Sequence, residues 1–99
     1  MIRKTRNPFE VLSQILNCLS MSGKRGYITS QIMRKANLDT TSTKNYIVFM
    51  LKKGLIIRIE SHPRDRFKLT EKGIKAKIKL HSLLTEIYSL MGESRGVYR

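Results

Sequence analysis

The sequence predicts a small, mainly α-helical domain of the α+β class that carries one β-hairpin. Apolar residues recur at spacings of three and four in several segments, as they do along amphipathic helices. A β-branched run over residues 55–59 and an alternating run over 66–70 flank a polar turn, which is typical of a hairpin. Ninety-nine residues, 40% of them apolar, allow one small core. We expect a flexible basic arm (1–7), a globular domain (8–70), a long C-terminal helix (71–92) and a tail (93–99).

The chain is strongly basic. Twenty lysines and arginines stand against seven acidic residues, and the formal net charge of +13 attracts such a protein to polyanions. Nucleic acid is the expected partner, with an anionic membrane surface as the alternative. No apolar run approaches the roughly 20 residues that span a bilayer, so we expect no membrane partner. No long apolar stretch follows the basic start, which predicts a cytoplasmic protein without a signal peptide.

The first predicted helix begins at Asn7 and Pro8. Asparagine is a good N-cap, and proline suits the first helical position because its missing N–H is not needed there. The helix ends near a basic turn, Gly23–Gly26, that matches no nucleotide-binding glycine motif. Its expected core face is formed by Phe9, Leu12, Ile15, Leu16 and Leu19.

Two further helices follow in close succession. Thr29 is the expected cap of a two-turn helix, and Asp39 caps a longer one that ends at Gly54. A short helix, a tight turn and a longer helix form the helix-turn-helix pattern, although short helix pairs also occur in many other small folds. The longer helix buries Ile47, Met50 and Leu51 and leaves a polar, uncharged or basic face, shaped for a groove; the alternative is an ordinary solvated face.

The predicted hairpin is basic at its rim. Its turn lies over residues 61–65, and Phe67 and Leu69 are expected to point inward. Arginine and lysine side chains would make it a positively charged finger beside the polar-faced helix; the alternative is a solvated loop. These basic residues are Arg58, Arg64, Arg66 and Lys68.

The last helix is expected to begin at Thr70 and to end before Gly92. Some twenty residues make about 30 Å of helix, which is longer than a domain of this size needs. Its second half has a wide apolar face with a 3-4-3 spacing, which predicts a homodimer through this helix; the alternative is that it folds back onto the first helix. The predicted interface residues are Leu80, Leu83, Leu84, Ile87, Tyr88, Leu90 and Met91.

Two short motifs carry a family resemblance. Leu51–Ile56 (LKKGLI) and, about a dozen residues later, Leu69–Gly73 (LTEKG) resemble small winged helix-turn-helix DNA-binding proteins of archaea and, more loosely, MarR-like and PadR-like regulators. The resemblance extends over residues 9–90. It implies a winged helix-turn-helix fold with a long C-terminal dimerisation helix, a recognition helix over Thr40–Lys53 and a wing tip over His62–Arg66. The wing is short and no effector pocket is recognisable, so we expect no small-molecule ligand.

Residues with the spacing that catalysis or metal binding needs are not apparent. The sequence has no nucleophile beside a base, no paired carboxylates and no zinc spacing, because Cys18 is the single cysteine. We expect Cys18 to be a small buried side chain and His81 to be a partly buried residue of the dimer interface. We expect no enzyme activity, catalytic residue, metal or cofactor.

Together these features predict a dimer that binds double-stranded DNA, with Thr40–Lys53 in the major groove. Base readout is expected from Thr41, Ser42, Lys44, Asn45 and Val48. Backbone contacts are expected from Lys24, Arg25, Thr40, Lys52, Arg58, Arg64, Arg66 and Lys68, and the N-terminal arm is either solvated or adds further contacts.

Three functions remain open at this point. The hydroxyl-rich helix face favours a nucleoid-associated, sequence-specific transcriptional regulator over a non-specific architectural DNA-binding protein. A protein-interaction module with the same fold is the third possibility, although it needs no basic hairpin. RNA binding lacks its aromatic platform, because Phe9, Phe49 and Phe67 are all expected in the core.

Overall fold

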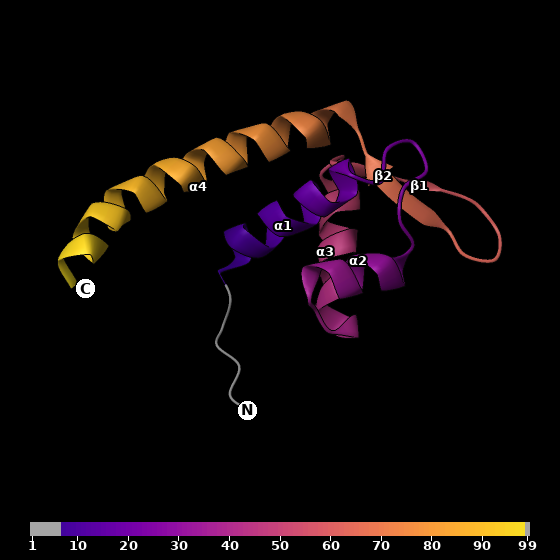
Figure 1. Ribbon diagram of the computed structural model, residues 1–99. Coiled ribbons are helices and arrows are strands. Elements are labelled where there is room, and N and C mark those ends of the chain that lie inside the picture. The colour runs from indigo at the N-terminus through magenta and orange to yellow at the C-terminus, as the bar shows by residue number, and fades with distance from the viewer. Residues whose placement is uncertain (1–6, 99) are drawn as a thin grey trace.

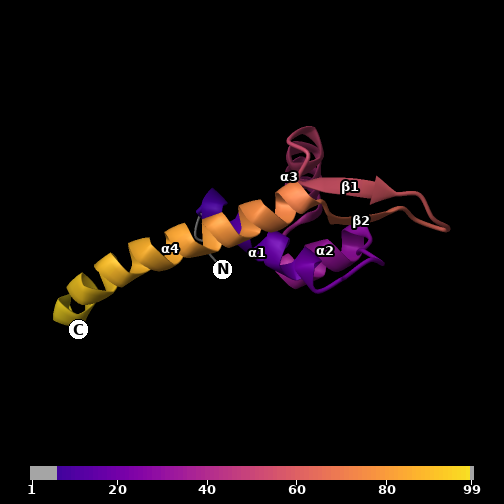
Figure 2. The ribbon, with the colours of Figure 1, turned by 90° about the horizontal axis from the view of Figure 1, so that it is seen from above.

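A computed structural model describes residues 7–98, with side chains described for 7–91. Most of the expected N-terminal arm therefore lies outside the described residues. The elements follow one another as α1 (Pro8–Ser20), α2 (Thr29–Ala36), α3 (Thr40–Lys52), β1 (Ile56–Ile59), β2 (Arg66–Leu69) and α4 (Glu71–Tyr98). Helix α1 lies between α4 on one side and α2 and α3 on the other (Figure 1). The hairpin projects from the end of the molecule that is opposite the C-terminal end of α4 (Figure 1 and Figure 2).

The core forms where α1 meets the other elements. Ile15 and Leu16 are fully buried against Ile32 of α2, Met50 of α3 and Ile56 of β1. At roughly 1.5–3 kcal/mol for each fully buried aliphatic side chain, these residues supply a large part of the folding free energy.

The N-terminus of α1 is capped as expected, but one predicted core residue lies outside the core. The Asn7 Oδ1 atom accepts a hydrogen bond from the Phe9 N–H at 2.8 Å. The Phe9 side chain is nevertheless 61% exposed, and Val11 is buried instead. The first turn of α1 extends past α2 and α3 (Figure 1). Within this turn Val11 faces the core, and Phe9, two residues earlier, is rotated from it by about 200°.

The turn between α2 and α3 is fixed by local hydrogen bonds. The N-cap of α2 is Ile28 and not Thr29; the Ile28 N–H donates to Gln31 Oε1 at 3.0 Å, which satisfies one free N–H without a hydroxyl cap. Helix α2 ends at Asn37, whose φ of 56° lies in the left-handed region. Asp39 then caps α3, because its Oδ1 accepts from the Ser42 N–H at 2.7 Å.

The hairpin is antiparallel and acquires a third, very short edge partner. Ile56 pairs with Leu69 at one end of the ladder and Ile59 with Arg66 at the other. Tyr27 pairs with Phe67 by two backbone hydrogen bonds, 2.9 and 2.8 Å long. These bonds tie the basic turn that precedes Tyr27 to the base of the hairpin.

One threonine joins the end of α3 to the start of α4. The Thr70 hydroxyl donates to the Gly54 carbonyl at 2.6 Å and accepts from the Gly73 N–H at 3.0 Å. Gly73 contacts the Leu55 carbonyl so closely that a Cβ atom there would collide with it. The two motifs behind the family resemblance are thus the two sides of one tight junction.

Helix α4 is longer than the sequence predicts. It was expected to end before Gly92 and to be followed by a tail, whereas it continues to Tyr98. A glycine costs a helix only about 1 kcal/mol relative to alanine, so it does not end a helix by itself. The far half of α4 extends beyond the rest of the domain (Figure 2).

Candidate nucleic-acid interface

The outward face of α3 is the centre of the candidate interface. Thr43, Ile47 and Met50 are buried and fix the rotation of the helix about its axis. The face opposite them is available to a ligand, except that Ser42 is half-buried and gives its N–H to the Asp39 cap. The exposed predicted readout residues are Thr41, Lys44, Asn45 and Val48.

Each end of α3 has a residue that is predicted to contact the DNA backbone. The helix also carries Phe49, which is expected in the core from the sequence. Thr40 and Lys52 are exposed; the Thr40 hydroxyl contacts Met33 Sδ at 3.5 Å. Phe49 is 42% exposed, and the Lys53 ammonium lies 6.0 Å from its ring centroid. Phe49 follows Val48 on the outward side of the helix, and counting from Ile47 at 100° per residue predicts this position.

The arginines of the hairpin differ in how freely they can reach a ligand. Arg58 lies 3.7 Å from Asp65 and above the Phe67 ring at 5.6 Å, so it braces the hairpin. Arg66 is half-buried and donates to the Gly26 carbonyl at 3.3 Å. Arg64 is exposed at the tip. Of the three arginines, Arg64 has the freest guanidinium.

The basic turn lies beside the hairpin. Lys24 and Arg25 are exposed and precede the strand-like pairing of Tyr27 with β2. Lys24 and the half-buried Lys68 both line a hollow of about 380 Å³. The structure therefore brings this turn and the hairpin together, although 40 residues separate Gly26 from Arg66 in the sequence.

Cations outnumber acidic residues at this end of the molecule. The hairpin contains Glu60 and Asp65 beside its four basic residues, and Asp65 pairs with Arg58. Unpaired cations close to one another are the arrangement that a polyanion stabilises.

Cys18 is buried, as expected, and burial raises the pKa of its thiol while the Lys35 ammonium lowers it by a smaller amount.

The predicted dimer residues of α4 divide between two faces. Leu80 packs against the core and Leu84 is half-buried near Glu10 of α1, so these two residues serve their own domain. Leu83 and Leu90, 53% and 67% exposed, face away. The exposed members of the predicted set are Leu83, Ile87, Tyr88, Leu90 and Met91.

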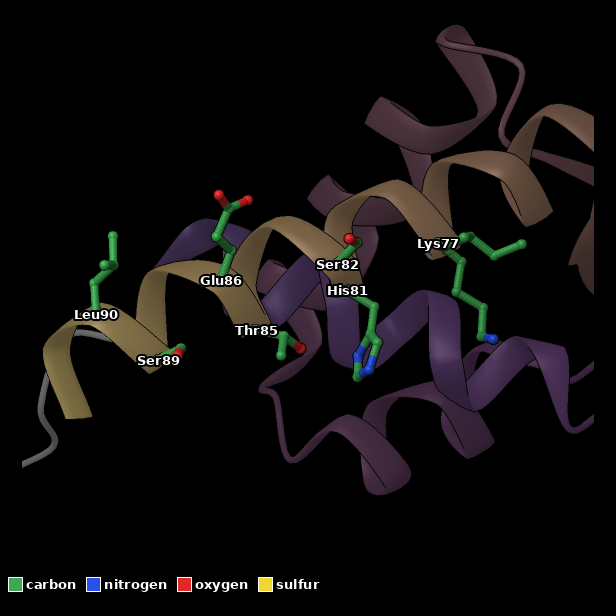
Figure 3. Close-up of a pocket in the computed structure, with 8 residues that line it drawn as sticks. Lys77, His81, Ser82, Thr85, Glu86, Ser89 and Leu90 are labelled. Carbon is green, nitrogen blue, oxygen red and sulfur yellow. The ribbon is translucent and has the colours of Figure 1, made fainter. Parts of the chain in front are cut away.

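A shallow hollow of about 610 Å³ lies along α4 alone. Lys77 and His81 extend toward α1, whereas Glu86 and Leu90 extend to the other side of the helix (Figure 3). His81 is exposed in the single chain and lies beside Gln14 of α1 at an open groove. Its burial in a dimer interface stays a prediction. A hollow lined by one helix and open to solvent cannot enclose a small molecule.

Metal-ligand clusters and membrane-spanning helices are both absent from the described residues. Among the described residues, no three His, Cys, Asp or Glu side chains lie close enough together to hold a metal ion. None of the helices in the described part of the chain is both long and apolar enough to cross a membrane.

A polar-faced third helix, a short helix before it and a basic hairpin after it define the winged helix-turn-helix class. Residues 5–88 match the family model described as winged helix-turn-helix, and the chain belongs to this family. The chain is also similar to the uncharacterized protein MJ0287 of the archaeon Methanocaldococcus jannaschii. The two are 35% identical over 89 residues, which cover 90% of this chain and 80% of that protein.

Solved structures have the same fold. Sso10a-2, a DNA-binding protein from Sulfolobus solfataricus, superposes with a TM-score of 0.80 at 16% identity and covers 93% of both chains. The complex of MepR from Staphylococcus aureus with DNA superposes with a TM-score of 0.68 at 20% identity; 83% of this chain matches 61% of that one. The hairpin is therefore the wing of a winged helix fold, and α3 is the helix that precedes it.

Proposed function

We propose that this protein binds double-stranded DNA as a homodimer, with α3 in the major groove and the wing on the flanking backbone. The observation that carries the proposal is the outward face of α3, which is mainly polar or basic with Val48 and Phe49 among its exposed residues. The Asp39 cap and three buried side chains hold this face in one orientation. A B-DNA major groove is about 12 Å wide and admits one α-helix. Two proteins of similar fold support the same partner, since Sso10a-2 is described as DNA-binding and MepR was solved with DNA.

Direct readout is assigned to the exposed positions of α3. Asn45 can pair with the N6 and N7 atoms of an adenine, and the Thr41 hydroxyl and Lys44 ammonium can reach neighbouring base edges. Val48 offers its methyl groups to a thymine methyl. Phosphate contacts hold the register and fall to the basic turn, the ends of α3 and the wing: Lys24, Arg25, Thr40, Lys52, Arg58, Arg64, Arg66 and Lys68.

Within this function we favour a sequence-specific transcriptional regulator. Side chains that offer both donors and acceptors to base edges are of little use to a protein that only coats DNA. A non-specific architectural protein is the second candidate, favoured by the excess of positive over negative charge on the wing and basic turn.

The test measures affinity and its salt dependence together. Fluorescence anisotropy with a random duplex and with a duplex from the gene's own upstream region is repeated from about 50 to 200 mM salt. A regulator prefers the upstream duplex at every salt concentration, and Asn45→Ala lowers that preference by about 1–3 kcal/mol. Equal affinities for both duplexes with a steep common slope would favour the architectural function. Absence of binding at the lowest salt would contradict DNA binding altogether.

A further inference from the structure

We infer that a row of lysines on the first half of α4 forms a second contact with the DNA backbone, beyond the recognition helix and the wing. Lys72, Lys75 and Lys79 are all exposed. Their spacing of three and four places them on one face of the helix. The inference rests on the proposed DNA binding and extends it to a part of the molecule that the fold alone would assign to dimerisation.

The lysine row continues the basic end of α3. The Lys72 Cδ atom lies 3.9 Å from the position that a Cβ on Gly54 would occupy, and Gly54 directly follows Lys52 and Lys53. The Thr70 hydrogen bonds hold this junction rigid. A duplex against α3 therefore meets Lys52 and Lys53 first and the α4 lysines next.

The dimensions of the row match a strand of DNA. Seven residues of helix separate Lys72 from Lys79, about 10 Å at a rise of 1.5 Å per residue. One strand of B-DNA presents a phosphate about every 3.4 Å along the axis, so the row passes about three phosphates. A shallow hollow between the lysines has Leu55, Ala76 and Ile78 in its lining, which supports the aliphatic stems while the ammonium groups remain in solvent.

A second copy of the chain is a poorer occupant of this surface than DNA. Residues 72–79 contain four lysines and no acidic residue, whereas residues 80–91 contain one acidic residue and no lysine or arginine. Like charges on two copies would repel each other along the first half, while the exposed leucines of the second half can pair. Among residues 7–91, no carboxylate lies within ion-pair distance of the three lysines.

Lys77 provides a matched control on the same helix. It lies two residues from Lys75, which turns its side chain by about 200°, and it extends toward α1 (Figure 3). Lys75→Gln and Lys77→Gln therefore each remove one positive charge from nearly the same position along the α4 axis, but from opposite faces of this helix. The triple variant K72Q/K75Q/K79Q removes the whole row, and its sedimentation and circular dichroism report whether the dimer and the helices remain.

The experiment measures the salt slope of binding to a random duplex of about 30 base pairs. Each lost phosphate contact lowers the magnitude of the slope of log K against log salt concentration by about 0.9. For each bound protomer the triple variant therefore loses about 2.7 from this slope. The ratio of its affinities at about 50 and 200 mM salt is then roughly 40-fold smaller than the wild-type ratio. Lys75→Gln takes about one third of that change, and Lys77→Gln changes the slope less, because its half-buried side chain lines the hollow of Lys24 and Lys68 on another face of the helix. A wild-type slope in the triple variant, an equal effect of Lys77→Gln, or dissociation of the triple variant into monomers would each overturn the lysine row alone. Failure of the wild-type protein to bind the duplex would overturn the proposed function together with it.

Discussion

Thr70 is the residue on which the geometry of the interface depends most directly. Its hydroxyl makes two hydrogen bonds, one to the end of α3 and one to the first turn of α4, and its own N–H donates to the Leu55 carbonyl at 3.0 Å. A shift at this point would move α3 relative to α4. The residue is therefore a structural link between the proposed recognition helix and the long helix.

Thr70→Val is expected to lower the free energy of unfolding by about 1–3 kcal/mol. Valine preserves the shape of the side chain but leaves the Gly54 carbonyl and the Gly73 N–H without their partner. Thr70→Ser retains both hydrogen bonds and is the matched control, expected within about 1 kcal/mol of wild type. Urea denaturation followed by circular dichroism measures both. Equal stabilities of the valine and serine variants would show that the hydroxyl has no such role.

Cys18 should make the stability of the protein depend on pH only in the alkaline range. Burial raises the pKa of its thiol above the ordinary value of 9.0, so above about pH 9 the unfolded chain loses this proton while the folded chain keeps it. The folded state then binds more protons, and the free energy of unfolding falls as the pH rises. Urea denaturation at pH 8 and pH 10 of wild type and of Cys18→Ala isolates this effect. The decrease between the two pH values should be smaller in the alanine variant, and equal decreases would contradict the assignment.

At the scale of elements, the wing offers two arginines with different expected effects. Arg64→Ala should reduce the salt slope of DNA binding by about 0.9 for each wing and leave the stability within about 0.5 kcal/mol, because the side chain is exposed. Arg66→Ala should reduce the slope similarly and also cost about 1 kcal/mol of stability, because it removes the hydrogen bond to Gly26. Anisotropy and urea denaturation separate the two effects. Unchanged slopes in both variants would show that the wing does not touch the backbone.

The caps and turns of the elements could be predicted from the sequence because they are local. The side-chain oxygens of Asn7, Asp39 and Thr70 each accept a hydrogen bond from a backbone N–H two or three residues away. Each of these interactions can therefore be predicted from a few consecutive residues. Gly54 has the φ of 75° that was expected where α3 ends. Prediction was wrong at Thr29, where the Gln31 side chain replaced the cap that a hydroxyl was expected to supply.

Which apolar residues reach the core was harder to predict, because it depends on neighbours distant in the sequence. Phe9 and Phe49 have suitable side chains, but both lie on helix faces turned away from the core. The sequence predicts Leu80 and Leu84 in the dimer interface, because the spacing of apolar residues shows that one face of the helix is apolar. The spacing does not show whether the same chain or a second copy covers that face. The sequence shows that residues 72–79 are basic, but it does not show where they lie, since only the folded junction brings Lys72 beside Gly54.

At the scale of the whole molecule, the proposed DNA-facing and self-associating surfaces are separated along one long helix. The first half of α4 lies against the rest of the domain and is basic, and the second half extends away from it with exposed leucines (Figure 1). Pairing through the second half would leave the recognition helices and wings of both copies exposed. Each protomer could then occupy one half-site of the same duplex, as in other dimeric helix-turn-helix proteins.

The double substitution L83E/I87E is therefore expected to produce a folded monomer. Both side chains are exposed in the single chain, so the charges should leave the core intact while preventing the burial of apolar surface on which association depends. The variant S82E/S89E adds the same charge to the same helix at exposed serines and should remain a dimer. Sedimentation velocity measures the mass, and anisotropy with a duplex long enough for two protomers should show an affinity about 10²–10⁴-fold weaker for the L83E/I87E variant, because the second half-site is no longer linked to the first. A dimer that survives L83E/I87E, or one that dissociates equally in both variants, would place the association surface elsewhere than on this face of α4.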